Sequence, residues 1–274
     1  MSREILSLPP PPFDARRVYG SETAQFGELR LPRGGQGGPV PVACVVHGGY
    51  YRVQYDLAHT GHLATALAHA GIAAWSIEYR RIGQPGGGWP GTFLDAGAGL
   101  DALRQLAPTY SLDLGRVIAL GHSAGGQLAL WLSSRRRLPA GSALSAPDPL
   151  PVAGVVALAP VADLERASAL RLSAGIVDQL LGGTPRAVPG RYALASPARR
   201  LPLGVPQIVV HGTADAAVPF ELSERYVAAA RAAGDPAELV ALPGVDHFDI
   251  IDPRTTAFVS TRQAAQRLLG LEVL

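Results

Sequence analysis

The chain has 274 residues, of which 47% are hydrophobic and 17% are charged, and its formal net charge at pH 7 is +2. This composition is typical of a globular protein and excludes a disordered or fibrous chain. A net charge so close to zero gives no reason to expect nucleic acid as a partner.

The first half of the chain alternates strand-like and helix-like segments. Two early strands, at 17–19 and 23–31, are expected to pair as a hairpin, and a glycine-rich turn over 33–41 follows them. The apolar run 42–46 predicts a strand that is covered on both faces. The predicted elements that follow are helix 57–70, strand 73–79, helix 92–106, strand 117–120 and helix 124–134.

The second half repeats this rhythm. Its predicted elements are strand 152–158, strand 207–210, helix 221–233, strand 238–242 and helix 255–269. Strands that alternate with long helices predict a mostly parallel, doubly wound α/β sheet with helices on both faces. Residues 163–203 break into short helical and Pro/Gly-rich pieces, which we interpret as a small cap-like insertion over one edge of the sheet. We therefore expect a single domain over residues 1–274.

The segment Gly121–Gly125 has the pattern G-x-S-x-G between a predicted strand and a predicted helix. The turn at such a site is so sharp that side chains on either side of the serine would collide, so glycines are required there. The turn exposes the serine hydroxyl at the end of the strand. We predict that Ser123 is a nucleophile, and the alternative is a plain packing turn.

A serine hydroxyl needs a general base, and the base needs an orienting carboxylate. After this kind of turn the chain order is serine, acid, histidine, each in a loop after a later strand. His247 follows the last predicted strand and is the expected base, whereas His211 closes a strand and is expected to have a structural role. Asp215 is the expected acid and Asp163 the alternative, because the carboxylates at 246 and 249 are too close to His247 in sequence.

The loop after strand 42–46 reads His47-Gly48-Gly49-Tyr50-Tyr51. Consecutive glycines let a backbone turn its N–H groups into a pocket, as an oxyanion hole requires. We predict that the N–H groups of Gly49 and Tyr50 form this hole together with that of Ala124, which follows the nucleophile. The alternative is a turn that only links a strand to a helix.

Together these residues resemble the α/β-hydrolase fold superfamily from about residue 42 onward, in the branch that includes esterases, lipases and kynurenine formamidases. The run 47–50 is similar to the His-Gly-Gly-Tyr-Trp signature of the formamidases, although Tyr51 stands where tryptophan is usual. The run 246–251 is also similar to the stretch around their histidine. Esterases that resemble hormone-sensitive lipase would have a third glycine at position 50. The resemblance implies neither a metal nor an organic cofactor.

Aromatic residues near these motifs predict a pocket for an aryl or acyl group. The resemblance suggests that the loop 86–91, with Trp89, walls this pocket, although a purely structural loop is an equal alternative. We expect Tyr51, Trp89 and Phe248 to contact the substrate, beside Tyr50. His59 and His62 stand three residues apart without a third ligand, which we interpret as a solvated helix face and not a metal site.

The expected function is a serine hydrolase for small carboxylic esters. An arylformamidase acting on N-formyl-kynurenine is the second hypothesis, followed by a peptidase and by a catalytically silent binder. The expected partner is a small-molecule ester or formamide, with neither nucleic acid nor membrane, and a homodimer is compatible with the sequence. The single cysteine, Cys44, excludes a disulfide framework, and we expect it to be buried. Because the sequence has no secretion signal and no apolar run of about 20 residues, we expect a soluble, cytoplasmic protein.

Overall fold

One eight-stranded sheet organises the protein in a computed structural model that describes residues 3–34 and 38–273. The strand order is β1-β2-β4-β3-β5-β6-β7-β8. The hairpin strands β1 and β2 are antiparallel to their neighbours, and every later pairing is parallel. The strands are β1 (Ala15–Val18), β2 (Phe26–Arg30), β3 (Val40–Val46), β4 (Ala73–Ile77), β5 (Leu112–His122), β6 (Gly154–Leu158), β7 (Gln207–Gly212) and β8 (Ala237–Leu242).

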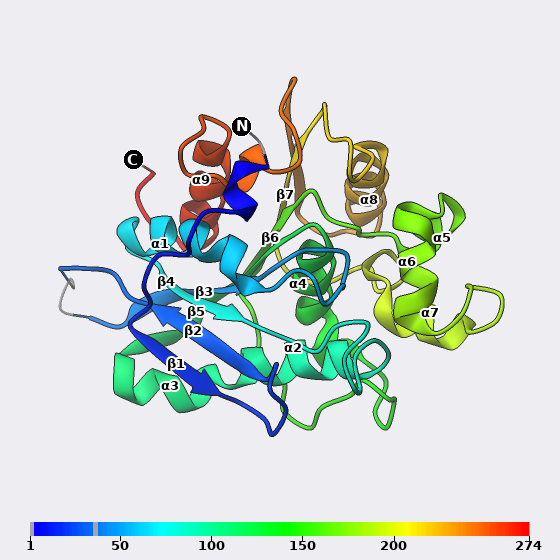
Figure 1. The fold of residues 1–274 in the computed structure, drawn as a ribbon, viewed down its shortest axis with the longest axis horizontal. Helices are drawn as coiled ribbons and strands as arrows, with labels where there is room; N and C mark the ends of the chain where they lie inside the picture. Colours follow the sequence, from blue (N-terminus) through cyan, green and yellow to red (C-terminus); the bar gives the residue numbers. More distant parts are fainter. Residues whose placement is uncertain (1–2, 35–37, 274) are drawn as a thin grey trace.

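Helices cover both faces of this sheet (Figure 1). The α-helices are α1 (Gly61–His69), α2 (Gly91–Asp101), α3 (Leu103–Tyr110), α4 (Ala124–Ser134), α5 (Leu164–Ala169), α6 (Leu172–Leu181), α7 (Pro189–Ala195), α8 (Glu221–Ala232) and α9 (Phe258–Leu268). The 3₁₀ helices are η1 (Glu4–Leu6), η2 (Leu57–Thr60), η3 (Arg135–Arg137), η4 (Pro197–Arg199) and η5 (Asp249–Ile251).

The alternation of side chains along β3 shows how two cores form. Val42, Cys44 and Val46 join the cluster shared with α2, α3, α4 and α8, while Ala43 and Val45 join the cluster shared with α1 and α9. All five side chains are buried, because a central parallel strand has helices on both sides. The prediction of a doubly wound sheet with helices on both faces is therefore confirmed, as is the burial of Cys44.

Several predicted element boundaries differ from the structure. Strand β5 begins at Leu112 and not near residue 117, because a β-bulge separates its pairing with Val40 from its pairing with Val42. The polar residues of the bulge interrupt the apolar run, so the first part of the strand has no strand-like pattern. The predicted helices 57–70 and 92–106 are each divided, into η2 with α1 and into α2 with α3.

The carboxyl ends of the parallel strands lie at one edge of the sheet, where the loops that carry the predicted motifs meet. The segment 163–203, which forms α5–α7 and η4, packs at this edge. It accepts hydrogen bonds from Arg52 after β3, from the Trp89 backbone before α2, and from Gln127 in α4. The opposite side of the edge is approached by η1, which Ile5 anchors in the α1/α9 core.

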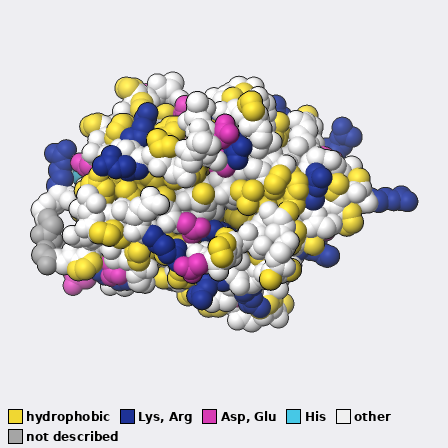
Figure 2. Space-filling model, turned by 90° about the horizontal axis from the view of Figure 1, so that it is seen from below, with side chains coloured by type: hydrophobic (Ala, Val, Ile, Leu, Met, Phe, Trp, Pro, Cys, Tyr) yellow, Lys and Arg dark blue, Asp and Glu magenta, His cyan; other side chains and the backbone are white. Residues whose placement is uncertain are grey.

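The molecular surface mixes both charges. On the face that Figure 2 shows, arginine side chains are scattered, and acidic side chains lie among them. Within the part of the chain that the structure describes, no helix is both long and apolar enough to cross a membrane.

Candidate active site

Ser123 lies at the turn between β5 and α4 in a strained backbone conformation, with φ 58° and ψ −119°. The turn is held by the N–H of Ser123, which donates to the Leu158 carbonyl oxygen of β6 at 2.7 Å. A Cβ on Gly125 would overlap the carbonyl oxygens of Val46 and His47, so this position accepts only glycine. The predicted strand–turn–helix setting is therefore present, and Ser123 lines a pocket at the edge of the sheet.

His247 lies in the loop after β8 and lines the same pocket. Its Nδ1 is 2.5 Å from Oδ2 of Asp215, so one ring nitrogen is held by a carboxylate. The backbone carbonyl of His247 accepts a hydrogen bond from Nε2 of His122 at 3.0 Å, and the two imidazole rings lie 4.4 Å apart. His122 thus ties the serine turn to the loop that carries His247.

The side chain of Asp215 is buried in the loop after β7 and accepts four hydrogen bonds. Its Oδ1 accepts from the backbone N–H groups of Ala217 at 2.7 Å and Val218 at 2.8 Å, and its Oδ2 faces His247 and His211. Burial alone would raise the pKa of Asp215, but the hydrogen bonds from the two histidines outweigh it and hold the pKa below its ordinary value. The group is therefore a carboxylate at neutral pH.

The alternative acid, Asp163, has a different task. Its side chain accepts from the N–H of Arg166 at 2.9 Å and caps the start of α5. It is not among the residues that line the pocket. The structure therefore brings Asp215, and not Asp163, to His247.

The loop after β3 packs directly on the serine turn. A Cβ on Gly48 would lie 2.7 Å from the carbonyl oxygen of His122 and 3.1 Å from Cβ of Ser123, so the close approach requires glycine. Gly49 and Tyr50 line the pocket, and Tyr50 has a left-handed φ of 52°. The Tyr50 hydroxyl holds this strained loop by donating to the Ala217 carbonyl oxygen at 2.6 Å.

A buried ionic network supports the same loop from behind. His47 Nε2 is 3.0 Å from Oε1 of Glu78, its Nδ1 is 2.8 Å from the Gly48 carbonyl oxygen, and its ring stacks on Tyr79. Burial disfavours the ionised form of Glu78, but His47 and Arg81 outweigh it and lower the pKa of this carboxyl. A fully hydrogen-bonded network of this kind fixes the backbone that it contacts.

Two of the predicted substrate-contacting residues lie elsewhere. The expectation for Tyr51 is wrong, because its side chain is completely buried in the core and its hydroxyl donates to Gln127 Oε1 of α4 at 3.0 Å. Trp89 does not line the pocket either; its ring packs against Phe93 of α2 and lies under the guanidinium of Arg191. Phe248, the third predicted residue, does line the pocket.

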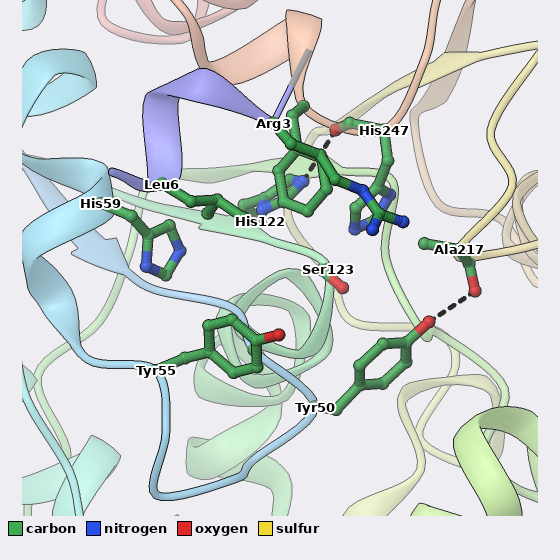
Figure 3. Close-up of a pocket in the computed structure, with 11 residues that line it drawn as sticks. Arg3, Leu6, Tyr50, Tyr55, His59, His122, Ser123, Ala217 and His247 are labelled. Atoms are coloured by element: carbon green, nitrogen blue, oxygen red, sulfur yellow. Dashed lines mark hydrogen bonds between the residues drawn. The ribbon is translucent and has the colours of Figure 1, made fainter. Parts of the chain in front are cut away.

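The pocket is a cavity of about 130 Å³ (Figure 3). Several of the residues that line it were not predicted from the sequence. Arg3 and Leu6 come from η1 and its start, Tyr55 and His59 from the segment before α1, and Ala217 from the loop after β7. No residue of 163–203 is among the lining residues found in the described chain. Figure 3 shows Tyr50, Tyr55 and His59 around the space in front of Ser123.

The interpretation of His59 and His62 as a solvated helix face is wrong for His59. Its side chain is buried against the pocket, while His62 is half-buried and bonds the Pro9 carbonyl. Burial and the neighbouring His47 lower the pKa of His59 to about 3, so its imidazole is neutral at pH 7. Arg3 is the one lining residue of the described chain that carries a permanent charge. Among residues 3–34 and 38–273, no group of three or more His, Cys, Asp or Glu side chains is arranged to hold a metal ion.

Comparison with known proteins places this site in a family. The BD-FAE family model matches residues 28–229, which is well over half of the chain and includes both strand ends that carry Ser123 and Asp215. The chain belongs to the BD-FAE family. Its fold is that of the α/β-hydrolases, as the sequence predicts.

Two curated relatives of this BD-FAE protein carry esterase names. It is 27% identical over 252 residues to esterase LipC of Mycobacterium tuberculosis, covering 88% of this chain and 61% of LipC. It is 27% identical over 244 residues to the probable isoprenylcysteine alpha-carbonyl methylesterase ICME of Oryza sativa subsp. japonica, covering 85% of this chain and 57% of the relative. The chain thus spans about three fifths of the length of these relatives.

Solved structures share the BD-FAE protein's fold. A truncated carbohydrate esterase from gut microbiota superposes with a TM-score of 0.78 at 19% identity, covering 96% of this chain and 100% of that one. Esterase 2 of Thermogutta terrifontis, in its apo form, superposes with a TM-score of 0.76 at 23% identity, covering 95% and 96%. These relatives are named as esterases, and the resemblance to kynurenine formamidases stays a prediction.

Proposed function

We propose that the protein is a serine hydrolase that cleaves small carboxylic esters by transient transfer of the acyl group to Ser123. The observation that carries the proposal is the 2.5 Å contact between His247 Nδ1 and Asp215 Oδ2, with His247 and Ser123 lining one pocket. The esterase names of the relatives agree with it.

In the first half of the reaction, Ser123 Oγ attacks the ester carbonyl carbon while Nε2 of His247 takes the hydroxyl proton. The carboxylate of Asp215 accepts from Nδ1–H, which leaves Nε2 unprotonated and able to act as the base. The tetrahedral intermediate then collapses, the ester C–O bond breaks, and the imidazolium of His247 returns its proton to the leaving alkoxide. An alcohol departs, and the acyl group remains on Ser123.

The negative charge on the carbonyl oxygen needs hydrogen-bond donors during both halves of the reaction. We assign this role to the N–H groups of Gly49, Tyr50 and Ala124. The strained loop after β3 and the first turn of α4 support this assignment, since both are fixed by packing before substrate arrives. Each preorganised donor of this kind stabilises a transition state by about 3 kcal/mol.

In the second half, water takes the place of the alcohol. His247 removes a proton from the water as it attacks the acyl carbon, the bond to Ser123 Oγ breaks, and the proton passes to Oγ. A carboxylic acid leaves and the hydroxyl of Ser123 is restored. The same three side chains carry out the proton transfers and the acyl transfer in both halves.

The pocket favours a short acyl group. Tyr50, Tyr55, Leu6 and Phe248 enclose a cavity of about 130 Å³ in front of Ser123. The Tyr50 side chain cannot swing away without breaking its 2.6 Å hydrogen bond to Ala217. Each methylene that finds no room forfeits about 1–3 kcal/mol of discrimination, so activity should fall beyond about six carbons.

A panel of para-nitrophenyl esters with acyl groups from two to twelve carbons tests this proposal. We expect acetyl and butyryl esters to give the highest kcat/KM and decanoyl esters a much lower one, with Ser123→Ala inactive on all of them. Faster turnover of decanoyl than of acetyl esters would contradict the short-acyl pocket and indicate an extended acyl-binding groove. Equal activity in wild type and Ser123→Ala would reject serine catalysis.

A further inference from the structure

A second histidine contacts the carboxylate of Asp215. His211, the penultimate residue of β7, is completely buried, and its Nε2 lies 3.0 Å from Oδ2 of Asp215 and 3.1 Å from the Val218 carbonyl oxygen. Its Nδ1 lies 2.7 Å from Oγ of Ser223 in α8. Both of its ring nitrogens therefore have partners, and neither partner of Nε2 can donate.

These partners determine where the hydrogens of His211 lie. Because a carboxylate and a carbonyl oxygen only accept, Nε2 carries a hydrogen and donates to both. The hydroxyl of Ser223 can donate to Nδ1, so the ring satisfies every neighbour in its neutral form. Oδ2 of Asp215 thus accepts from two imidazoles at once, His211 at 3.0 Å and His247 at 2.5 Å.

We propose that His211 is a positioning residue that holds the Asp215 carboxylate toward His247 and limits how strongly that carboxylate stabilises protonated His247. This inference rests on the proposed function. The N–H of His211 donates to Oδ2, and the backbone N–H groups of Ala217 and Val218 donate to Oδ1, so both carboxylate oxygens are fixed in position. The same N–H partly neutralises the negative charge on Oδ2, the oxygen that His247 contacts. The carboxylate therefore stabilises the His247 imidazolium less strongly than it would without His211.

The effect on the reaction has a definite sign. If the His211 donor is removed, the undivided charge of Asp215 stabilises the imidazolium of His247 more strongly. His247 then stays protonated to higher pH, and less of it is available as a base near neutrality. The acid limb of kcat/KM therefore moves to higher pH.

Asp215, whose carboxylate loses a donor in this change, is one of the groups that face His247. The other titratable or charged groups that face it are Asp246, His122, Arg3, Tyr50 and, across the pocket, His59. Burial lowers the pKa of His122 and lowers that of His59 to about 3, so both imidazoles are neutral at pH 7. Burial also raises the pKa of Tyr50 to about 12, so this phenol stays neutral.

A matched pair of amide variants isolates the donor. The amide nitrogen of His211→Gln reaches the position of the imidazole Nε2 and can donate to Asp215, whereas the shorter His211→Asn cannot reach it. Both retain a polar side chain at the same buried place. His211→Phe, which keeps a planar ring without a donor, takes the place of His211→Asn if the asparagine variant does not fold.

The measurement is the NMR titration of the His247 ring in the full chain, together with the pH profile of kcat/KM for para-nitrophenyl acetate. In His211→Asn we expect the His247 midpoint and the acid limb to rise by about half to one pH unit, and in His211→Gln to stay at the wild-type values. Identical midpoints in wild type and both variants, or equal shifts in the two variants, would overturn the proposal. If the wild type hydrolyses no ester, the proposed function fails, while the NMR titration still decides the role of His211.

Discussion

Replacing Asp215 by asparagine changes one atom at the centre of the hydrogen-bond network. Oδ1 accepts from two backbone N–H groups, at 2.7 Å and 2.8 Å, so the amide oxygen of asparagine must occupy that position. The amide NH₂ then takes the place of Oδ2 and faces Nδ1 of His247 and Nε2 of His211. Both nitrogens donate in the wild type, so donors now face donors.

The magnitude follows from the tautomer that His247 must adopt. To accept from the amide, Nδ1 gives up its hydrogen and Nε2 carries it, so the nitrogen that faces the serine can no longer act as a base. We expect kcat to fall by about 10³–10⁴ in Asp215→Asn. His211 keeps its bond to Val218, so the free energy of unfolding should fall by only about 1–3 kcal/mol, the cost of the unsatisfied donors.

The assay pairs kcat on para-nitrophenyl acetate with urea unfolding, and Asp163→Asn serves as the control. Asparagine caps a helix as well as aspartate does, so the control should keep its activity within about two-fold and its stability within a few tenths of a kcal/mol. A folded Asp215→Asn with nearly full activity would refute the reasoning. A large loss of activity in Asp163→Asn would show that the acid had been assigned to the wrong loop.

Three further substitutions test the packing of the site. Because burial lowers the pKa of His59 to about 3, the fold excludes a proton that the unfolded chain binds below pH ~6.5, so stability falls as the pH drops. Between pH 6 and pH 5, the free energy of unfolding from urea denaturation should therefore fall by up to about 1.4 kcal/mol less in His59→Gln than in the wild type. An equal fall in the two proteins would contradict the burial argument. Gly125→Ala should abolish activity and lower the free energy of unfolding by about 1–3 kcal/mol through overlap with backbone oxygens. In the control Gly190→Ala, the added Cβ meets no heavy atom within 4 Å, so thermal melts and ester hydrolysis should both match the wild type. Tyr51→Phe removes the hydrogen bond to Gln127 and should lower the free energy of unfolding by about 1–2 kcal/mol, while KM for acetyl esters stays within about two-fold of the wild-type value. A large rise in KM would show that Tyr51 contacts the substrate after all.

The parts of the site that local rules govern could be predicted from the sequence. Steric crowding at the serine turn makes the glycines of 121–125 recognisable, and the order of strands puts the loops of Asp215 and His247 at one edge of the sheet. Each of these features depends on residues close in sequence or on the regular alternation of strands and helices.

Residues brought together by long-range packing could not be predicted in this way. Leu6 reaches the pocket because Ile5 anchors η1 in a core formed by helices more than fifty residues away. Tyr50 and Tyr51 are adjacent tyrosines with similar left-handed φ angles, and only distant partners, Ala217 for one and Gln127 for the other, decide which of them faces the cavity. Sequence spacing carries no information on those partners.

Covalent labelling tests the central claim most directly. The protein is treated with an aryl fluorophosphonate, digested, and analysed by mass spectrometry to find the modified residue. The account predicts one adduct per chain on Ser123, no adduct in Ser123→Ala, and much slower labelling in His247→Ala, because the hydroxyl needs its base. An adduct on another residue, or ester hydrolysis that persists while Ser123 stays unlabelled, would contradict it.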